Sequence, residues 1–383
     1  MKLSLRSAIV AMAVALPSAL AGQVKASIGD VDFKFKFGGR TNLDLGTYMG
    51  ADDGKANRNG VSVNDTRLSL IADIDTVWQV KIEMSFSNRA ASFRDVFIKR
   101  TFKTTSSEVQ IGNILLPFGL LRQGVNYKLI ELAPADNAYT PGRKLGAAYS
   151  QYLPHFNWSV GLYSDGAIDQ GGQTNKGYSF MAHGLVRPID DGGTIFHIGA
   201  TGLFTHPSST VTFNATAPHT FSTGPSKTLF STPTMEVYNY GRLNVNALTI
   251  VRRFYAEAHF IKAWVNRPNE TSVTSGGETQ TVAQSNYNDS YGVYVQAAWR
   301  FFGPNHSYNR KTGLTGNATS RALEVLARFS QLDLDTYGAV NDVTLGMNYF
   351  INRYLRLKVN YVHSHIRGGA DLDLIQGRFQ FSF

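Results

Sequence analysis

The chain has 383 residues, with 37 Lys and Arg against 28 Asp and Glu, a formal net charge of +9 and no cysteine. The lack of cysteine excludes a disulfide scaffold, a Cys-ligated zinc site and an iron–sulfur centre. The mean hydropathy of −0.17 excludes a bundle of membrane-spanning helices. The 18 Tyr and 24 Phe, with only 17% charged residues, exclude a disordered chain.

The N-terminus has the three parts of an export signal. Lys2 and Arg6 form a basic segment, and the small, apolar stretch 7–20 is too short to span a bilayer. Ala19-Leu20-Ala21 offers a cleavage site, so we expect a signal peptide at 1–21 and a mature chain at 22–383. Cleavage after residue 26 is the alternative site, and a buried N-terminal helix is the competing interpretation.

The rest of the chain alternates apolar and polar residues, as in Trp78-Gln79-Val80-Lys81-Ile82-Glu83-Met84. Alternation places successive side chains on opposite faces of a strand. We find no stretch with a sustained helical period. The pattern predicts about sixteen strands, at 33–49, 62–75, 77–87, 92–103, 107–113, 144–153, 156–164, 177–188, 193–206, 235–250, 252–266, 287–302, 319–332, 341–351, 353–366 and 373–383.

The connections between these strands alternate in length. Short ones lie near 76, 104–106, 154–155, 251 and 352, and long ones lie at 50–60, 114–143, 164–176, 207–234 and 267–286. This alternation is typical of transmembrane barrels, which have tight turns on the periplasmic side and long loops outside. Residues 303–318 form one long link where a short turn is expected. The pattern therefore predicts an all-β fold, a single antiparallel transmembrane β-barrel; a repeat of soluble β-sandwiches is the competing fold.

The last strand ends in an aromatic residue. Phe383 closes the chain, and Phe381 and Phe379 share its face. An apolar outer face follows from contact with lipid. By resemblance to outer-membrane barrels as a class, we expect Phe383 to be the signal recognised by the barrel-assembly machinery.

The charged strand residues should face the lumen, because a charge facing lipid at mid-bilayer costs about 2–4 kcal/mol. About sixteen strands leave a water-filled lumen, and a ring of Arg and Lys around such a pore favours anions. Barrel closure should make Arg40, Arg67, Arg356 and Arg378 one basic patch, since they lie on the first, second and last strands. We expect eleven basic residues in the lumen, opposed by the three acids Asp44, Glu83 and Glu324: Lys34, Lys36, Arg40, Arg67, Lys81, Arg242, Arg300, Arg328, Arg356, Lys358 and Arg378. The strand at 92–103 has charges on both faces, which indicates a bulge or an error in register.

The segment 114–143 is too apolar for an exposed loop, and Pro117, Gly119, Gly124 and Pro134 punctuate it. It can fold into the barrel as a constriction loop, or it can cap the barrel from outside. If it folds inward, it adds further cations to the basic wall, opposed by Glu131 and Asp136: Arg122, Lys128, Arg143 and Lys144.

Other classes of protein are less well supported. A barrel enzyme would need a Ser–His pair or acids with His at the rim, and His363 and His365 share one face of their strand with no Ser placed beside them on it. The same pair gives only two metal ligands, without Cys or a carboxylate cluster. An adhesin would explain the long loops but not the basic wall, and an exported lumen argues against nucleic acid as the reason for the charge. We expect no catalytic site, metal or cofactor.

Several motifs resemble those of the phosphate-selective porin O and P family. Phe37-Gly38-Gly39-Arg40 with Asp44 is similar to its opening strand, and Thr66-Arg67-Leu68-Ser69-Leu70 is similar to its second strand. Arg94-Asp95-Val96-Phe97-Ile98 resembles its "L-K-D-A-Y-L" strand. Val109-Gln110-Ile111-Gly112-Asn113 followed by Leu116-Pro117-Phe118-Gly119-Leu120 resembles its "G-x-x-K-x-P-F-G" entry into the third loop. Arg143-Lys144-Leu145-Gly146 resembles the start of the next strand, and the long link after Gly303 is typical of the family.

The resemblance implies a sixteen-stranded outer-membrane barrel of a Gram-negative bacterium, a homotrimer whose inward third loop, with Pro117, Phe118 and Gly119, and basic wall admit small anions such as phosphate. Two departures stand out. Leu115 and Leu116 occupy the place of the lysine before P-F-G, and the family's phosphate-binding lysine has only loose counterparts in Lys128 and Lys144. A general diffusion porin without selectivity therefore stays open as the alternative.

Overall fold

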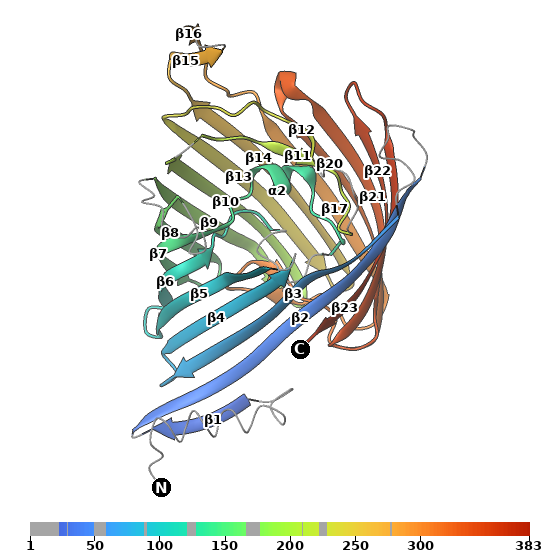
Figure 1. The fold of residues 1–383 in the computed structure, drawn as a ribbon. Helices are drawn as coiled ribbons and strands as arrows, with labels where there is room; N and C mark the ends of the chain where they lie inside the picture. The colour runs from blue at the N-terminus through green and yellow to red at the C-terminus, as the bar shows by residue number, and fades with distance from the viewer. Residues whose placement is uncertain are drawn as a thin grey trace.

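The structure is a computed structural model that describes residues 23–28, 30–49, 59–87, 90–120, 128–165, 177–208, 210–221, 228–275 and 278–383. The expected signal peptide at 1–21 and Arg122 lie outside the described residues. Within this part of the chain, sixteen antiparallel strands form a closed barrel, and β2 and β23 pair to complete the ring (Figure 1). The predicted all-β barrel is confirmed.

The barrel strands follow the chain order, each paired with the next. They are β2 (Val31–Met49), β3 (Asn59–Ile74), β4 (Trp78–Ser87), β5 (Ala90–Phe102), β6 (Ser107–Leu115), β7 (Arg143–Tyr152), β8 (Phe156–Ser164), β9 (Tyr178–Asp191), β10 (Thr194–His206), β13 (Asn239–Val251), β14 (Phe254–Asn266), β17 (Tyr291–Phe302), β20 (Ala322–Asp333), β21 (Ala339–Phe350), β22 (Leu355–Ile366) and β23 (Leu372–Ser382). Each overlaps one predicted strand.

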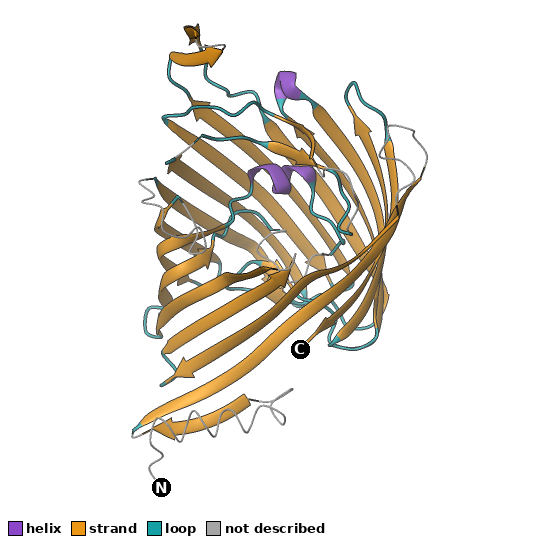
Figure 2. Ribbon diagram, in the orientation of Figure 1, coloured by secondary structure: helices purple, strands orange, loops and turns teal. Residues whose placement is uncertain are grey.

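The smaller elements were not predicted from the sequence. β1 (Gln23–Ile28) pairs with the start of β2. Three hairpins lie in connections: β11 (Asn214–Thr216) with β12 (Thr228–Ser231), β15 (Glu270–Ser275) with β16 (Glu278–Ala283), and β18 (Tyr308–Asn309) with β19 (Leu314–Thr315). Helix α2 (Pro134–Tyr139) and the 3-10 turn η1 (Asp335–Tyr337) are the short helical elements in Figure 2. No helix among the described residues is both long and apolar enough to cross a membrane.

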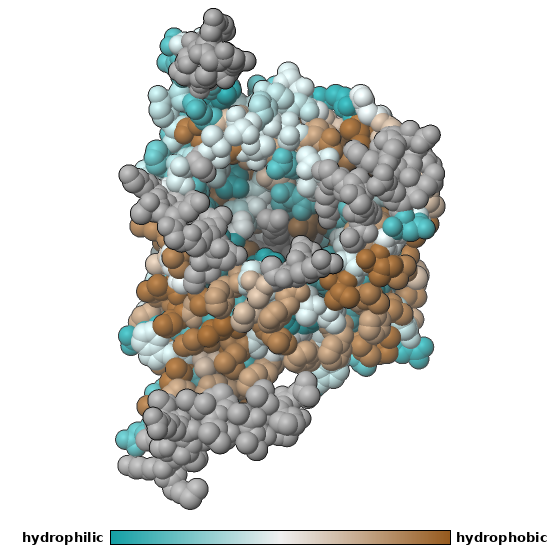
Figure 3. All heavy atoms as spheres, viewed as in Figure 1, coloured by the Kyte–Doolittle hydropathy of each residue, from teal (hydrophilic) through white to brown (hydrophobic). Residues whose placement is uncertain are grey.

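The strand faces follow the predicted alternation. In β22, Arg356 and Lys358 are buried inside the barrel, while Leu357 and Val359 are exposed on the outside. On the face shown in Figure 3, the outward side chains form a hydrophobic band over the lower half of the barrel, which is the surface that lipid requires.

The turns at the two ends of the barrel differ as predicted. β9 and β10 are joined by Gly192 and Gly193, whose φ angles of 52° and 94° suit the type I′ turn that the twist of a hairpin favours. The start of β2 and the C-terminus lie at this end of the barrel (Figure 1). The predicted exception is also present: residues 303–321 join β17 to β20 at the same end and carry the β18–β19 hairpin.

The C-terminal residue is tied to the first barrel strand. The Phe383 N–H donates to the Gly39 carbonyl at 3.0 Å, and the Gly39 N–H donates to the Phe383 carbonyl at 3.0 Å. A Cβ on Gly39 would lie 2.7 Å from the Phe383 ring, so only glycine lets the terminal ring lie against this strand.

Candidate functional site

Two β-bulges turn extra charges into the lumen. Between β2 and β3 the register shifts at 40–42, where Asp65 adopts a φ of 59°. Between β4 and β5 it shifts at 82–84, which brings Arg94 and Asp95 together opposite Glu83. The bulge indicated by charges on both faces of this strand is therefore confirmed.

These charges form a continuous chain of ion pairs, which we call the ion-pair belt. Asp65 pairs with Arg40 and with Arg67. Glu83 accepts from Arg67 at 3.0 Å and from Lys81 at 2.9 Å. Asp95 accepts from Lys81 at 2.5 Å and from Arg143 at 2.6 Å. Each carboxylate thus lies between two cations. In order across the wall, the belt is Arg40, Asp65, Arg67, Glu83, Lys81, Asp95 and Arg143.

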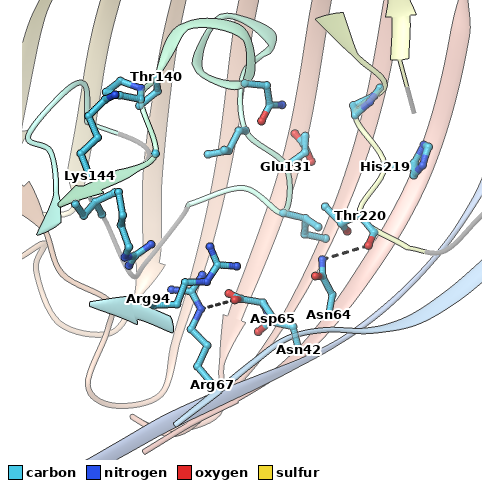
Figure 4. Close-up of a pocket in the computed structure, with 18 of the residues that line it drawn as sticks. Asn42, Asn64, Asp65, Arg67, Arg94, Glu131, Thr140, Lys144, His219 and Thr220 are labelled. Carbon is cyan, nitrogen blue, oxygen red and sulfur yellow. Dashed lines mark hydrogen bonds and ion pairs between the residues drawn. The ribbon is translucent and has the colours of Figure 1, made fainter. Parts of the chain in front are cut away.

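A cavity of about 760 Å³ opens at the belt (Figure 4); we call it the upper cavity. Six cations line it: Arg67, Arg94, Arg143, Lys144, Arg242 and Arg378. Three carboxylates line it as well: Asp65, Glu131 and Asp165. Asn64 and the carbonyl of Thr220 close one side with a hydrogen bond of 3.2 Å. Cations therefore outnumber carboxylates in this cavity by two to one.

Arg94 differs from the other cations of the upper cavity. It lies near Arg67 (Figure 4), and Arg143 also acts on it through space. Its Nε is buried without a hydrogen-bond partner, and no carboxylate of the described residues makes an ion pair with it. By contrast, Lys144 donates to Asp165 at 2.9 Å and Arg378 to Asp44 at 2.6 Å. Asp65 and Glu83 act on Arg94 through space only, so among the described residues its positive charge has no carboxylate in direct contact.

A second cavity of about 700 Å³ lies toward the end of the barrel where β2 begins; we call it the lower cavity. Its charged lining consists of Lys25, Lys34, Lys99, Lys311, Asp32, Asp73 and Glu108. Lys36, above it, donates to Asp73 at 2.6 Å, and Lys311 donates to Glu108 at 2.7 Å. Signs are nearly balanced here, unlike in the upper cavity.

Residues 128–140 lie between β6 and β7 in the sequence and contact the inner face of the barrel at β13, β20, β22 and β23. Glu131 accepts from Arg328 at 2.9 Å, from Asn360 at 2.8 Å and from Gln376 at 2.7 Å. At the end of α2, the Tyr139 carbonyl accepts from Arg242 at 2.6 Å. Inward side chains of β13, β20, β22 and β23 therefore hold this segment in place.

Lys128 occupies a buried cluster of charges. Its Nζ lies 3.2 Å from Glu324 and 3.4 Å from His306, and Arg300 also contacts Glu324, at 3.1 Å. Burial lowers the pKa of Lys128, with Glu324 opposing and Arg300 adding to the effect. Burial and the nearby Lys128 lower the pKa of His306 to about 3, so His306 is neutral at pH 7.

The expected loop residues Pro117, Phe118 and Gly119 pack against β10 and β14. Thr201 donates to the Pro117 carbonyl at 3.0 Å, and Phe118 is fully buried. A Cβ on Gly119, whose φ is 81°, would lie 2.7 Å from His259. This close approach, together with the positive φ, requires glycine at this position.

The predicted pore cations fall into distinct groups. Arg40, Arg67, Lys81 and Arg143 belong to the belt, and Lys144, Arg242 and Arg378 line the upper cavity. Lys34 lines the lower cavity, with Lys36 above it. The other predicted pore cations among the described residues are buried inside the barrel: Lys128, Arg300, Arg328, Arg356 and Lys358.

The expected balance of eleven basic residues against three acids is wrong. Further acids face the lumen: Asp65, Asp73, Asp95, Glu108, Glu257 and Asp342. Closure does bring Arg40, Arg67, Arg356 and Arg378 onto neighbouring strands, but Asp44 and Asp65 divide the patch. The sequence does not reveal Asp65 because only the bulge turns it inward, nor Arg94 because its strand has charges on both faces.

No three His, Cys, Asp or Glu side chains of the described residues are grouped as a metal site requires. His363 instead accepts or donates a hydrogen bond with Asp373 at 2.9 Å, and His365 does so with Asp371 at 2.7 Å.

Comparison with known proteins places the fold. The sequence profile of the family described as phosphate-selective porin O and P matches residues 35–383. Solved structures with similar folds include OmpT of Vibrio cholerae in its trimer form (TM-score 0.56, 11% identity, 92% of this chain and 99% of that chain). An anion-selective porin from Comamonas acidovorans has a TM-score of 0.54 and 11% identity, over 92% of this chain and 100% of that chain. The outer membrane channel DcaP of Acinetobacter baumannii has a TM-score of 0.55 and 12% identity, over 92% of this chain and 97% of that chain. No curated protein sequence matches the chain.

Proposed function

Because the chain belongs to the phosphate-selective porin O and P family and forms a channel in the outer membrane of a Gram-negative bacterium, we propose that this channel passes small anions in preference to cations. The observation that carries the proposal is the charge of the upper cavity. Six cations and three carboxylates line it, and Arg94 has no carboxylate partner among the described residues. Excess positive charge on a pore wall raises the local concentration of anions and repels cations.

Phosphate is the anion that these side chains fit best. Guanidinium groups offer planar pairs of donors that match the oxygens of phosphate, and Arg67, Arg94 and Arg143 lie together on one wall of the cavity. We therefore propose phosphate-like anions as the preferred solutes.

A general diffusion channel is the second candidate. The ion-pair belt supports it, because four cations alternate with three carboxylates and so leave little net charge. The choice between the two candidates depends on whether the excess charge around Arg94 dominates the neighbouring belt.

The segment 114–143 acts in this proposal as the constriction loop. Its support is the set of hydrogen bonds that the Glu131 carboxylate and the Tyr139 carbonyl accept from inward side chains of four strands. A loop held there reduces the cross-section of the lumen, as the resemblance to the family implies.

The remaining proposals concern export and assembly. We propose that residues 1–21 are removed on export, with cleavage after 26 as the alternative, and that the barrel-assembly machinery recognises Phe383. The exposed apolar band supports contact with outer-membrane lipid. The fold shared with the trimeric OmpT structure supports a homotrimer.

Planar-bilayer recordings test the function. In a KCl gradient, the reversal potential should have the sign that reports chloride passing faster than potassium, and added phosphate should reduce the chloride current. A potential near zero with no effect of phosphate would favour the general diffusion channel. A cation-selective potential would overturn the proposal.

A further inference from the structure

We propose that ions cross this barrel along one sector of its wall, the wet sector formed by β2 to β7, and that the packed sector formed by β8 to β23 carries no current. The proposal rests on the proposed function only in taking the protein to be a channel. It holds whether anions or cations are preferred.

Both cavities lie along the wet sector, and the upper cavity also reaches Arg242 of β13 and Arg378 of β23, which are held by the Tyr139 carbonyl and by Asp44. The upper cavity and the lower cavity share the strands β2, β3, β5 and β6 in their linings. Asp65 lines the first and Asp73 the second, eight residues apart on β3, which corresponds to about 26 Å along a strand. Each cavity therefore occupies one end of the same stretch of wall.

The side chains between the two cavities remain accessible to water. The exposed fractions are 18% for Lys81, 13% for Glu83, 16% for Asp95 and 20% for Lys99. These side chains form lateral ion pairs within the wall, so water reaches this sector from the belt down to the lower cavity.

The packed sector is dry over the same depth. The exposed fractions of its charged side chains are 1% for Arg300, 0% for Glu324 and 0% for Arg328. Further along, inward positions are apolar: Met181, Leu203 and Ile261 are fully buried in one cluster with Phe118 and Tyr139. Side chains packed in this way leave no space through which a hydrated ion could pass.

The link 303–321 covers the packed sector at its lower end. It starts at β17, yet its tip reaches strands far around the ring: Arg310 pairs with Asp190 of β9 at 2.6 Å, and Lys311 pairs with Glu108 of β6 at 2.7 Å. Asn157 of β8 donates to the Arg310 carbonyl at 2.5 Å. At the tip, Lys311 lines the lower cavity, so the link reaches the margin of the wet sector at β6.

This arrangement divides the basic residues by role. Arg300, Arg328 and Lys358 position the loop and the link, whereas Lys81, Arg94 and Arg143 meet the permeating ion. The residues that determine selectivity are therefore those of the wet sector.

The absence of cysteine from the chain allows a direct test with single cysteines. Ser69 lies on β3 between the cavities and faces inward, paired in register with Gly38 and Glu83. Ser330 lies on β20, faces inward and is fully buried. We would make Ser69→Cys and Ser330→Cys, add methanethiosulfonate ethylsulfonate during bilayer recording, and verify modification by mass spectrometry.

The expected result is that S69C reacts and loses most of its current, while S330C keeps its current. A loss of current in S330C as large as in S69C would overturn the proposal, as would a modified or unreactive S69C whose current is unchanged. If S330C does not fold, Thr344→Cys on β21 provides the same measurement in the packed sector, since Thr344 is also fully buried. Reversal potentials recorded before the reagent is added separate the two proposals, because a cation preference would contradict the proposed function and leave the result for the route intact.

Discussion

The wet sector and the packed sector carry the same kinds of side chain on the same alternating strands, and yet those side chains have different environments. In the wet sector Lys81 is shared between two carboxylates of neighbouring strands and stays in contact with water. In the packed sector Arg328 is buried against Glu131 of a distant loop. The neighbours of a lumen cation thus decide whether it meets water or holds a loop. The alternation of residues along its own strand does not show which neighbours it has.

The energetics of the two sectors differ accordingly. The pairs of the wet sector are in contact with water, so salt screens them in part and each contributes less to stability than a fully buried pair. A buried pair is costly to form, but removal of one partner leaves an uncompensated charge and costs about 3–5 kcal/mol. Changes in the packed sector should therefore affect stability, and changes in the wet sector should affect selectivity.

The largest expected effect follows from removal of Arg328. Arg328→Met leaves Glu131 buried with only Asn360 and Gln376 as donors, so we expect the barrel to lose about 3–5 kcal/mol of unfolding free energy. Urea unfolding in detergent micelles, followed by tryptophan fluorescence, measures this loss.

A double variant controls for this loss. Arg328→Met with Glu131→Leu removes both charges and should recover much of the stability. Arg353→Met, an exposed change in the turn before β22, should leave stability unchanged. If R328M unfolds as the parent does, the description of the packed sector is wrong.

The next effect concerns the dependence of stability on pH. His306 faces Lys128 from the loop, Glu324 from β20, Arg300 from β17 and the Tyr255 ring from β14. Since its pKa falls from 6.5 to about 3 on folding, the unfolded chain takes up a proton below pH 6.5 that the folded chain does not. Stability is fully present above pH 6.5 and falls by at most about 1.4 kcal/mol per pH unit as the pH drops toward 3.

Unfolding curves at pH 7 and pH 5 test this. His306→Gln should remove part of the acid sensitivity, whereas His365→Gln, with a side chain 60% exposed, should not. Equal acid sensitivity in the parent and in H306Q would contradict the assignment of a neutral, buried His306.

The smallest of these effects is on selectivity. Lys81→Gln leaves Glu83 and Asp95 without the cation that they share, which should shift the ratio of anion to cation permeability toward cations by about 1 kcal/mol, or roughly fivefold. Lys262→Gln, on the outer face beside Trp264, is the matched control. An unchanged reversal potential in K81Q would remove the belt from the permeation path.

The sequence predicts the barrel well because contact with lipid imposes a period of two on every strand. It predicts less of the lumen, where no such rule applies. Met181, Leu203 and Ile261 are apolar although they face inward. They pack against Phe118 and Tyr139 of the segment 114–143 and do not meet water. Asp65 and Arg94 depend on bulges that change the register by one residue, and the contacts of Glu131 join residues about 200 positions apart.

The central claim, that selectivity is set by the wet sector, is tested most directly by the reversal potentials of two variants in one KCl gradient. Arg94→Gln removes the cation that lacks a carboxylate partner among the described residues, and Arg300→Gln removes a buried cation from the opposite wall. We expect the ratio of chloride to potassium permeability to fall severalfold in R94Q and to stay at the parent value in R300Q. An unchanged ratio in R94Q, or an equal fall in R300Q, would contradict it.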